Sequence, residues 1–170
     1  MHYNTVILGA GAAGMMCAAH SGGSVLLVDH ARAPGEKIRI SGGGRCNFTN
    51  MHCSPGAFIS RNPHFAKSAL AKYTQWDFIA LVDAHAIAWH EKTLGQLFCD
   101  TSAKLIIAML RDLMQNAGVE LRLQSTVEQI EKTDSGYSMS LITPQGATTV
   151  TANQLVIASG GKSIPKMGAT

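Results

Sequence analysis

The apolar residues of this chain fall into short runs that alternate with segments of helical periodicity. Residues 5–8 and 25–28 are β-type apolar runs, and the small-residue segment between them suits a helix. Apolar side chains at helical spacing also form one face of residues 101–117, which Gly118 ends, and residues 119–123 resume a strand pattern. Strands that alternate with helices in this way are typical of an α/β protein with a parallel sheet.

Two further patterns of apolar and polar residues occur in the rest of the chain. Residues 62–91 repeat apolar side chains at helical spacing, and residues 94–99 suit a short strand or a turn. From residue 126 to residue 151, three alternating runs are separated by Asp-Ser-Gly and Pro-Gln-Gly turns, which predicts a small antiparallel meander. Residues 155–158 then predict a buried strand that returns to the parallel sheet.

A glycine fingerprint follows the first apolar run. Gly9, Gly11 and Gly14 have the G-x-G-x-x-G spacing between a strand and a helix. Gly9 allows the tight turn, Gly11 lets a pyrophosphate approach the backbone, and Gly14 lets the helix lie against the strand. Asp29 follows the second run, where a carboxylate can accept hydrogen bonds from ribose hydroxyls, and this favours FAD or NAD over NADP. A glycine-rich turn without a ligand is the alternative, but the combined features favour a dinucleotide-binding unit.

Together these patterns predict an α/β fold of three layers, an FAD/NAD(P)-binding Rossmann variant with a parallel central sheet. The meander, at about 126–151, would be a crossover insert of the kind found in FAD domains of the glutathione-reductase type.

A glycine-rich, cationic segment lies at residues 35–50. It contains three successive glycines and the cations Lys37, Arg39 and Arg45. Backbone without Cβ atoms can lie against a flat or phosphorylated ligand, and the cations can neutralise a pyrophosphate. On residue types alone, a flexible surface loop is the alternative.

Composition narrows the classes of function. The chain has 170 residues, 46% of them hydrophobic and 15% charged, as in globular α/β proteins. The net charge of +3 and the lack of a Lys/Arg block argue against nucleic-acid and membrane partners. The apolar runs are too short to span a membrane, and the first strand begins too early for a signal peptide. Four cysteines without metal-ligand or C-x-x-C spacing predict reduced thiols, no metal site and a cytoplasmic location.

Two motifs carry a resemblance to a known family. The first motif is G-E-K at 35–37 followed by S-G-G-G-R-C-N-F-T-N at 41–50, and the second is V-I-A-S-G-G-K-S-I-P-K-M-G at 156–168. Both are similar to signature motifs of the BaiN-like bacterial flavoproteins. These are two-dinucleotide-binding-domain proteins, described as NAD(P)/FAD-dependent oxidoreductases or as the aminoacetone oxidase family. The family usually has Thr where this chain has Ser159, and often Glu where it has Asp29. Its members are more than twice as long, so we expect residues 1–170 to be the N-terminal part of an FAD-binding domain. An inserted substrate-side domain and a closing C-terminal segment would then be absent.

The resemblance implies FAD as the cofactor. It implies that the pyrophosphate lies on the glycine-rich turn and the adenosine ribose at Asp29. Lys37 and the 41–47 segment would run from the pyrophosphate toward the flavin, and the backbone of Val127 meets adenine in folds of this type. The residues predicted to bind FAD are Gly9, Gly11, Ala12, Ala13, Gly14, Asp29, His30, Lys37, Ser41, Gly43, Gly44, Arg45, Cys46, Asn47, Val127, Ser159, Gly160 and Gly161.

The activity implied is hydride transfer through the flavin, with NADH or NADPH as the candidate electron donor and a small-molecule substrate of unknown identity. Two alternatives stay open: a non-catalytic FAD-binding module, and an NAD-dependent dehydrogenase, against which the 41–50 segment argues. Cys46 beside a flavin can act as a charge-transfer partner, but without a neighbouring cysteine in sequence a structural role is favoured. No residue is predicted to be catalytic, because no acid/base pair or nucleophile triad stands out.

Overall fold

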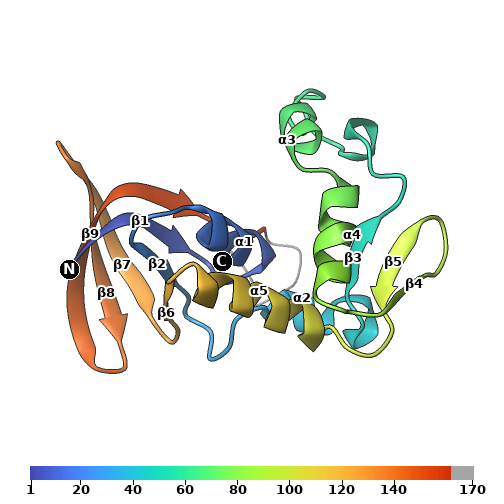
Figure 1. The fold of residues 1–170 in the computed structure, drawn as a ribbon. Coiled ribbons are helices and arrows are strands. Elements are labelled where there is room, and N and C mark those ends of the chain that lie inside the picture. The colour runs from blue at the N-terminus through green and yellow to red at the C-terminus, as the bar shows by residue number, and fades with distance from the viewer. Residues whose placement is uncertain (162–170) are drawn as a thin grey trace. The chain divides into compact units, whose positions relative to one another are not determined.

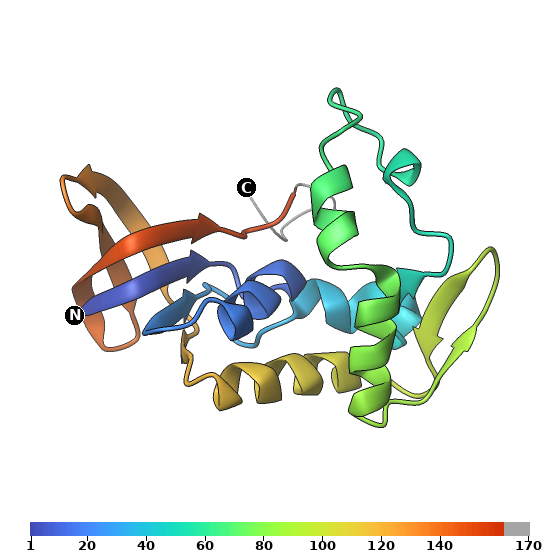
Figure 2. The same cartoon turned by 45° about the horizontal axis from the view of Figure 1, so that its top comes forward.

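The computed structural model describes residues 1–161 of the chain. The chain divides into two units, one formed by Met1–Lys37 with the chain from Leu110 onward, and one formed by Ile38–Met109. Figures 1 and 2 show the elements of each unit. The end of the second predicted motif, from Lys162 to Gly168, lies outside the described residues.

A six-stranded sheet in the order β6-β2-β1-β9-β8-β7 forms the first unit. Its strands are β1 (His2–Leu8), β2 (Val25–Val28), β6 (Glu120–Arg122), β7 (Thr126–Thr133), β8 (Gly136–Thr143) and β9 (Gly146–Ile157). Neighbours from β6 through β2 and β1 to β9 are parallel, whereas β9, β8 and β7 are antiparallel (Figure 1). Helix α1 (Ala12–His20) connects β1 to β2. The predicted α/β fold with a parallel sheet and an antiparallel meander is confirmed.

The long strand β9 corrects one prediction. The sequence predicted that the third meander strand and the returning strand at 155–158 are separate, but β9 runs without a break from Gly146 to Ile157. Its first half pairs with β8 and its second half pairs with β1. No glycine or proline lies between residues 147 and 157 to break the strand. The predicted burial of residues 155–158 is also wrong, because Leu155, Val156 and Ala158 are only half-buried and Ile157 is 61% exposed.

Apolar strand residues form the core of this unit. All four residues of β2 are buried, as expected for a parallel strand that is covered on both faces. Met15 and Ala18 of α1 are fully buried, which explains why that helix consists of small and apolar residues. Met139 and Leu141 of β8 extend the core into the meander, where alternate residues are buried.

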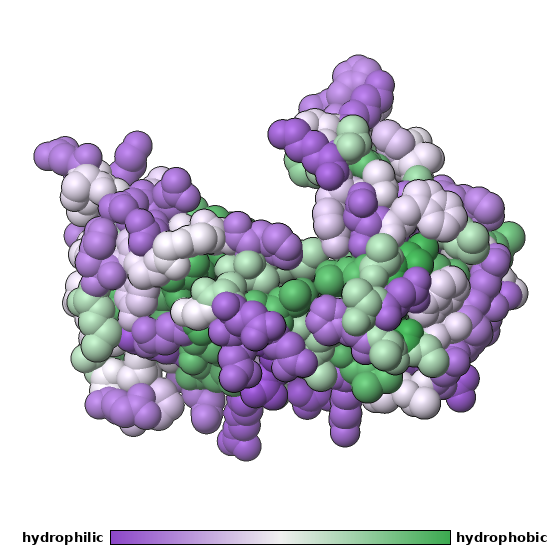
Figure 3. Space-filling model, viewed as in Figure 1, coloured by the Kyte–Doolittle hydropathy of each residue, from purple (hydrophilic) through white to green (hydrophobic). Residues whose placement is uncertain are grey.

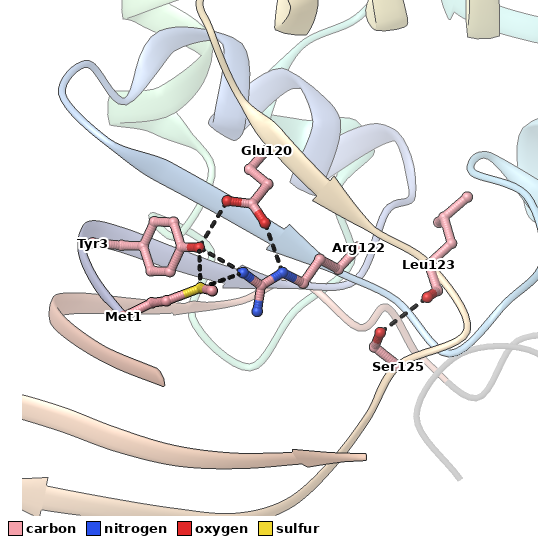
Figure 4. A network of polar contacts seen from close by, with 6 residues as sticks. All are labelled: Met1, Tyr3, Glu120, Arg122, Leu123 and Ser125. Atoms are coloured by element: carbon pink, nitrogen blue, oxygen red, sulfur yellow. Dashed lines mark hydrogen bonds and ion pairs between the residues drawn. The ribbon is translucent and has the colours of Figure 1, made fainter. Parts of the chain in front are cut away.

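A polar network anchors the short edge strand β6 to β1 (Figure 4). The Tyr3 hydroxyl donates to Glu120 Oε2 at 2.7 Å and accepts from Arg122 Nη2 at 2.8 Å, and Arg122 Nε donates to Glu120 Oε1 at 2.7 Å. Burial opposes ionisation of Glu120, but the hydrogen bonds from Tyr3 and Arg122 and the Arg122 charge outweigh it. The pKa of Glu120 therefore lies below its ordinary value. Buried Ser125 donates to the Leu123 carbonyl at 2.9 Å just beyond β6.

The second unit contains a three-stranded antiparallel sheet in the order β3-β5-β4. The strands are β3 (Asn47–Asn50), β4 (Trp89–Glu91) and β5 (Gln96–Cys99), and the helices are α3 (Lys67–Lys72) and α4 (Gln75–Ala84). Short 3₁₀ turns lie at η1 (Ser41–Gly44) and η2 (Pro55–Ala57). Helix α2 (Glu36–Ile40) begins among residues of the first unit and ends in the second, and α5 (Lys104–Asn116) does the reverse.

The predicted helical stretch at 62–91 contains both α3 and α4, but its end is a strand. Thr74 and Asp77 form a capping box that begins α4, and the ring of Phe78 lies 6.0 Å from that of Phe48 in β3. Residues 89–91 leave the helical pattern because β4 pairs with β5, which lies at the predicted strand or turn at 94–99. The helix predicted at 101–117 is α5. Among the described residues, no helix combines the length and apolarity needed to cross a membrane.

Candidate functional site

Three chain segments of the first unit meet at the carboxyl ends of its parallel strands. The Gly9 amide at the end of β1 donates to the Val28 carbonyl at 2.8 Å, and the Ala158 amide after β9 donates to the Leu8 carbonyl at 2.8 Å. The Asp29 amide donates to the Arg122 carbonyl of β6 at 3.0 Å. The structure thus brings together the predicted residues that follow β1, β2 and β9 at the carboxyl ends of these strands, where ligands bind in open α/β folds.

Two of the three fingerprint glycines are required by the packing of the protein itself. Gly9 has φ +108°, and a Cβ there would lie 2.5 Å from the carbonyl oxygen of Ala158. A Cβ at Gly14 would overlap the carbonyl oxygen of Gly9. The tight turn predicted at Gly9 and the close helix–strand contact predicted at Gly14 are therefore features of this structure.

Gly11 differs from the other two glycines. Its φ of −83° suits any residue, and a Cβ there would meet no protein atom within 4 Å. Gly11 is also the N-cap of α1, and neither a side-chain cap nor an acidic residue in the first turn neutralises that end of the helix. The unpaired N–H groups of this turn, next to the exposed residues Ala12 and Ala13, suit a bound anion.

The Asp29 carboxylate braces the glycine-rich turn. Its Oδ2 accepts from the Ala10 amide at 2.6 Å and its Oδ1 from the Ala31 amide at 2.8 Å, while the exposed His30 ring lies 3.5 Å from Oδ1. The Ala10 carbonyl in turn accepts from the amide of Gly35, which has φ +73°. Sequence reasoning missed this brace. For the Gly35 contact alone, the Pro34-Gly35 pair was a local signal of a turn, because glycine readily adopts positive φ. The predicted contact of Asp29 with a ribose stays a prediction.

Lys37 lies beside the residues that follow β9. Its Nζ donates to the Gly161 carbonyl at 2.7 Å, and a Cβ at Gly160 would lie 3.6 Å from that nitrogen. Gly160 has φ +79°, which other residues rarely adopt. Ser159 and these two glycines are exposed, so a cation and three small residues lie together after the strand.

The predicted loop residues Ser41, Gly43, Gly44, Arg45, Cys46 and Asn47 belong to the second unit. They form the turn η1 and the start of β3. All three glycines at 42–44 have positive φ, and a Cβ at Gly42 would lie 2.6 Å from the Phe98 ring. The Cys46 amide donates to the Ser41 carbonyl at 3.0 Å, and the Ala103 amide donates to the Gly44 carbonyl at 2.7 Å. Backbone hydrogen bonds therefore define this turn.

Two cysteine thiols of the second unit are buried. Burial raises the pKa of Cys46, and burial together with the nearby Cys46 raises the pKa of Cys99 to about 11. Both groups are thiols rather than thiolates at neutral pH, which favours the structural role predicted for Cys46. In the described part of the chain, no group of three or more His, Cys, Asp or Glu side chains could hold a metal ion.

Val127 lies in β7, the strand at the opposite edge of the sheet from β6. It is half-buried and packs against the core of the first unit. The segment just before β7 bonds to the chain after β2, because the Ser125 amide donates to the Asp29 carbonyl and the Gln124 amide donates to the Ala31 carbonyl, each at 3.0 Å. The start of β7 is thus tied to the segment that carries Asp29, and the predicted contact of Val127 with adenine stays a prediction.

Comparison with known families agrees with this arrangement. The family model described as the HI0933-like protein Rossmann domain matches residues 3–170. The chain belongs to this family.

Two similar relatives of this HI0933-like chain carry the same name. It is 53% identical over 171 residues to the ribosomal RNA dihydrouridine synthase of Escherichia coli (strain K12), covering 99% of this chain and 42% of that protein. It is 45% identical over 168 residues to the ribosomal RNA dihydrouridine synthase of Haemophilus influenzae, covering 97% of this chain and 42% of that protein. The chain thus spans about two fifths of the length of these relatives.

A solved structure supports the fold. The 3-ketosteroid-Δ4-(5α)-dehydrogenase of Rhodococcus jostii RHA1 superposes with a TM-score of 0.69 at 14% sequence identity, covering 94% of this chain and 46% of that one. At this identity the likeness concerns the fold alone. Family and fold together identify the chain as an HI0933-like Rossmann domain.

Proposed function

We propose that the first unit of this HI0933-like chain binds the dinucleotide part of FAD at the carboxyl ends of β1, β2 and β9. The observation that carries this proposal is the open space at Gly11, where the fold itself does not require glycine but an approaching pyrophosphate does. The uncapped N-terminus of α1 supplies N–H groups and a partial positive charge at the same place. FAD, when bound, supplies hydride-transfer chemistry, and the protein binds and orients it.

The residues of the first unit suit distinct parts of this cofactor. The amides of Gly11, Ala12 and Ala13 would hold the pyrophosphate. The Asp29 carboxylate would keep its two backbone hydrogen bonds and use its remaining lone pairs for a ribose hydroxyl. A role for Ser159, Gly160 and Gly161 beside the flavin, and for the 41–47 segment, is part of the proposal on the strength of the family resemblance.

For the whole protein, we propose that the substrate is a uridine of ribosomal RNA. Dihydrouridine differs from uridine by two hydrogens across the C5–C6 bond, so its formation consumes one hydride and one proton. A flavoprotein with NADH or NADPH as the electron donor can supply the hydride. The 53% identity to a ribosomal RNA dihydrouridine synthase supports this substrate. This proposed RNA substrate differs from the sequence-based expectation of a small-molecule substrate and no nucleic-acid partner. The expected cytoplasmic location remains part of the proposal.

A small-molecule oxidoreductase of the aminoacetone oxidase family is the second candidate. The 41–50 motif favours it, because that motif resembles the BaiN-like flavoproteins. The two candidates share FAD and differ in the electron acceptor, so one experiment separates them.

The experiment uses the purified full-length protein. Its absorption spectrum is recorded before and after anaerobic addition of NADH or NADPH, and unmodified ribosomal RNA transcribed in vitro is then added. Flavin bands that bleach and return with RNA, together with dihydrouridine detected by mass spectrometry of the digested RNA, are the expected result. Flavin that bleaches but produces no dihydrouridine would favour the second candidate. Flavin bands that never bleach would indicate a binding module or another donor, and absence of flavin after reconstitution would refute the FAD site.

A further inference from the structure

The cations of this chain are unevenly distributed. Residues 37–76 contain six of the 14 lysines and arginines and none of the 11 aspartates and glutamates. The rest of the chain carries the other eight cations and all of the acids, so its formal charge is negative. The modest net charge of +3 is therefore the sum of a basic stretch at residues 37–76 and a remainder of the chain that is acidic. Basic stretches of this kind attract polyanions.

Large aromatic rings lie exposed within this basic stretch. Residues 58–76, here called the basic aromatic segment, include helix α3 and belong to the second unit. Phe65 is 76% exposed and Trp76 is 53% exposed, and the same segment also exposes Phe58, Ile59 and Tyr73. Figure 3 shows hydrophilic and hydrophobic side chains next to one another over the part of the chain that carries α3. Several exposed rings within one segment indicate an interaction surface rather than a core.

The cations between these rings are available to a partner. Arg61, Lys67 and Lys72 are exposed, and in the part of the chain that the structure describes none of them forms an ion pair with a carboxylate. The first acidic residue after them, Asp77, is engaged by the Thr74 amide and hydroxyl, each at 2.7 Å, in the cap of α4. The segment therefore combines unpaired positive charge with flat apolar rings.

We propose that the basic aromatic segment is an RNA-contacting surface that binds single-stranded or loop RNA. Bases stack on its exposed rings, and phosphates lie beside Arg61, Lys67 and Lys72. This pairing of rings and cations is how proteins bind unpaired nucleotides. Exposed rings alone would also suit a protein partner, whereas three cations without an acid within residues 58–76 favour a polyanion. The inference rests on the proposed function, because ribosomal RNA is the substrate proposed there.

The charge contribution is tested with a triple variant of the full-length protein, Arg61→Ala, Lys67→Ala and Lys72→Ala. The matched control removes the same charge from other exposed positions through Lys104→Ala, Arg111→Ala and Lys132→Ala. The probe is a fluorescein-labelled, single-stranded oligouridine of about 20 nucleotides, enough for one or more stacking sites. Fluorescence anisotropy over a range of salt concentrations measures its affinity. We expect the triple variant to bind at least about tenfold more weakly at low salt, with a salt slope smaller by about 2, since each lost phosphate contact lowers it by roughly 0.7. The control should bind like the wild type.

The stacking contribution is tested with Phe65→Ala and Trp76→Ala. Each should weaken binding roughly tenfold without changing the salt slope, because stacking involves no released counterion. Phe65→Trp keeps a flat ring and should restore the affinity. Photo-crosslinking with 4-thiouridine in the same oligonucleotide should give adducts on peptides from residues 58–76. Unchanged thermal unfolding and FAD content show that each variant is folded.

Two results would overturn the inference while leaving the proposed function standing. One is equal affinity of the triple variant and its control when the wild type binds RNA and forms dihydrouridine. The other is crosslinking confined to peptides outside residues 58–76, which would mean that another surface binds RNA and that these rings serve a protein partner. A wild-type protein that binds FAD but neither binds RNA nor forms dihydrouridine would overturn both proposals.

Discussion

Gly11 and Gly14 lie three residues apart, and the structure gives them different reasons to lack a side chain. Gly11→Val places its side chain in open space at an ordinary backbone conformation, so the folded protein tolerates it. The loss of a favourable N-cap residue costs at most about 1 kcal/mol. If a pyrophosphate uses that space, the valine displaces it from at least one charge-assisted hydrogen bond, which is worth about 1.5–3 kcal/mol. We therefore expect FAD affinity to fall at least about tenfold.

Gly14→Ala is the matched contrast. Alanine in a helix gains about 1 kcal/mol over glycine, but here its Cβ would overlap the Gly9 carbonyl oxygen. Backbone cannot move aside as cheaply as a side chain, so overpacking at the upper end of about 1–3 kcal/mol is expected. The net loss of about 1–2 kcal/mol corresponds to a fall in Tm of roughly 2–8 °C for a protein of this size.

Thermal unfolding of the FAD-free variants and titration with FAD, followed by quenching of flavin fluorescence, separate the two effects. We expect Gly11→Val to lose FAD affinity with a fall in Tm of no more than about 2–4 °C, and Gly14→Ala to lose Tm without a direct effect on the pyrophosphate position. Wild-type FAD affinity in Gly11→Val would refute the assignment of that space to the cofactor. Wild-type stability in Gly14→Ala would refute the packing argument.

The remaining predictions concern charge, thiols and the η1 turn. Because the pKa of Glu120 is lowered in the folded protein, its contribution to stability is complete above its unfolded pKa and is lost as the pH falls through the folded one. Urea unfolding of Glu120→Gln should therefore show a small loss in the free energy of unfolding at neutral pH, under about 1 kcal/mol because the Glu120 side chain is half-exposed, and this loss should disappear in acid. Iodoacetamide at neutral pH should label half-buried Cys53 before Cys99, because a pKa of about 11 keeps the Cys99 thiol protonated. Mass spectrometry measures the order of labelling, and the reverse order would contradict the buried environment of Cys99. In chemical denaturation, Gly42→Ala should lower the free energy of unfolding more than Gly43→Ala does, by at least about 1 kcal/mol. Both glycines have positive φ, but only Gly42 lies against the Phe98 ring. Equal losses would mean that backbone conformation alone matters.

The sequence predicted the elements that depend on neighbouring residues. The strand, glycine-rich turn and helix at the start of the chain follow from local spacing, and so do the two turns of the meander. Pairing between strands that are distant in the chain was harder to predict from the sequence. Residues 89–91 have a helical apolar pattern but pair with β5, and residues 152–154 look like a connection but continue β9 because β8 and β1 pair with its two halves.

The candidate site shows the same division. The fingerprint residues were found from spacing, and the two glycines with a steric role in the fold were explained correctly. The brace from Asp29 to Ala10, which joins residues 19 apart, was not predicted, because a carboxylate at that position could equally face solvent or a ribose. The exposure of the rings in the basic aromatic segment was also hidden, since apolar residues at helical spacing usually indicate a buried face.

For this protein, the sequence alone determined the α/β class and the dinucleotide fingerprint, because periodicity and glycine spacing are properties of the chain itself. Only the tertiary structure decided which strands are neighbours, which glycine lacks a steric reason within the protein, and which aromatic rings stay exposed. These depend on what lies across from each residue after folding, and that is set by contacts between segments far apart in the chain.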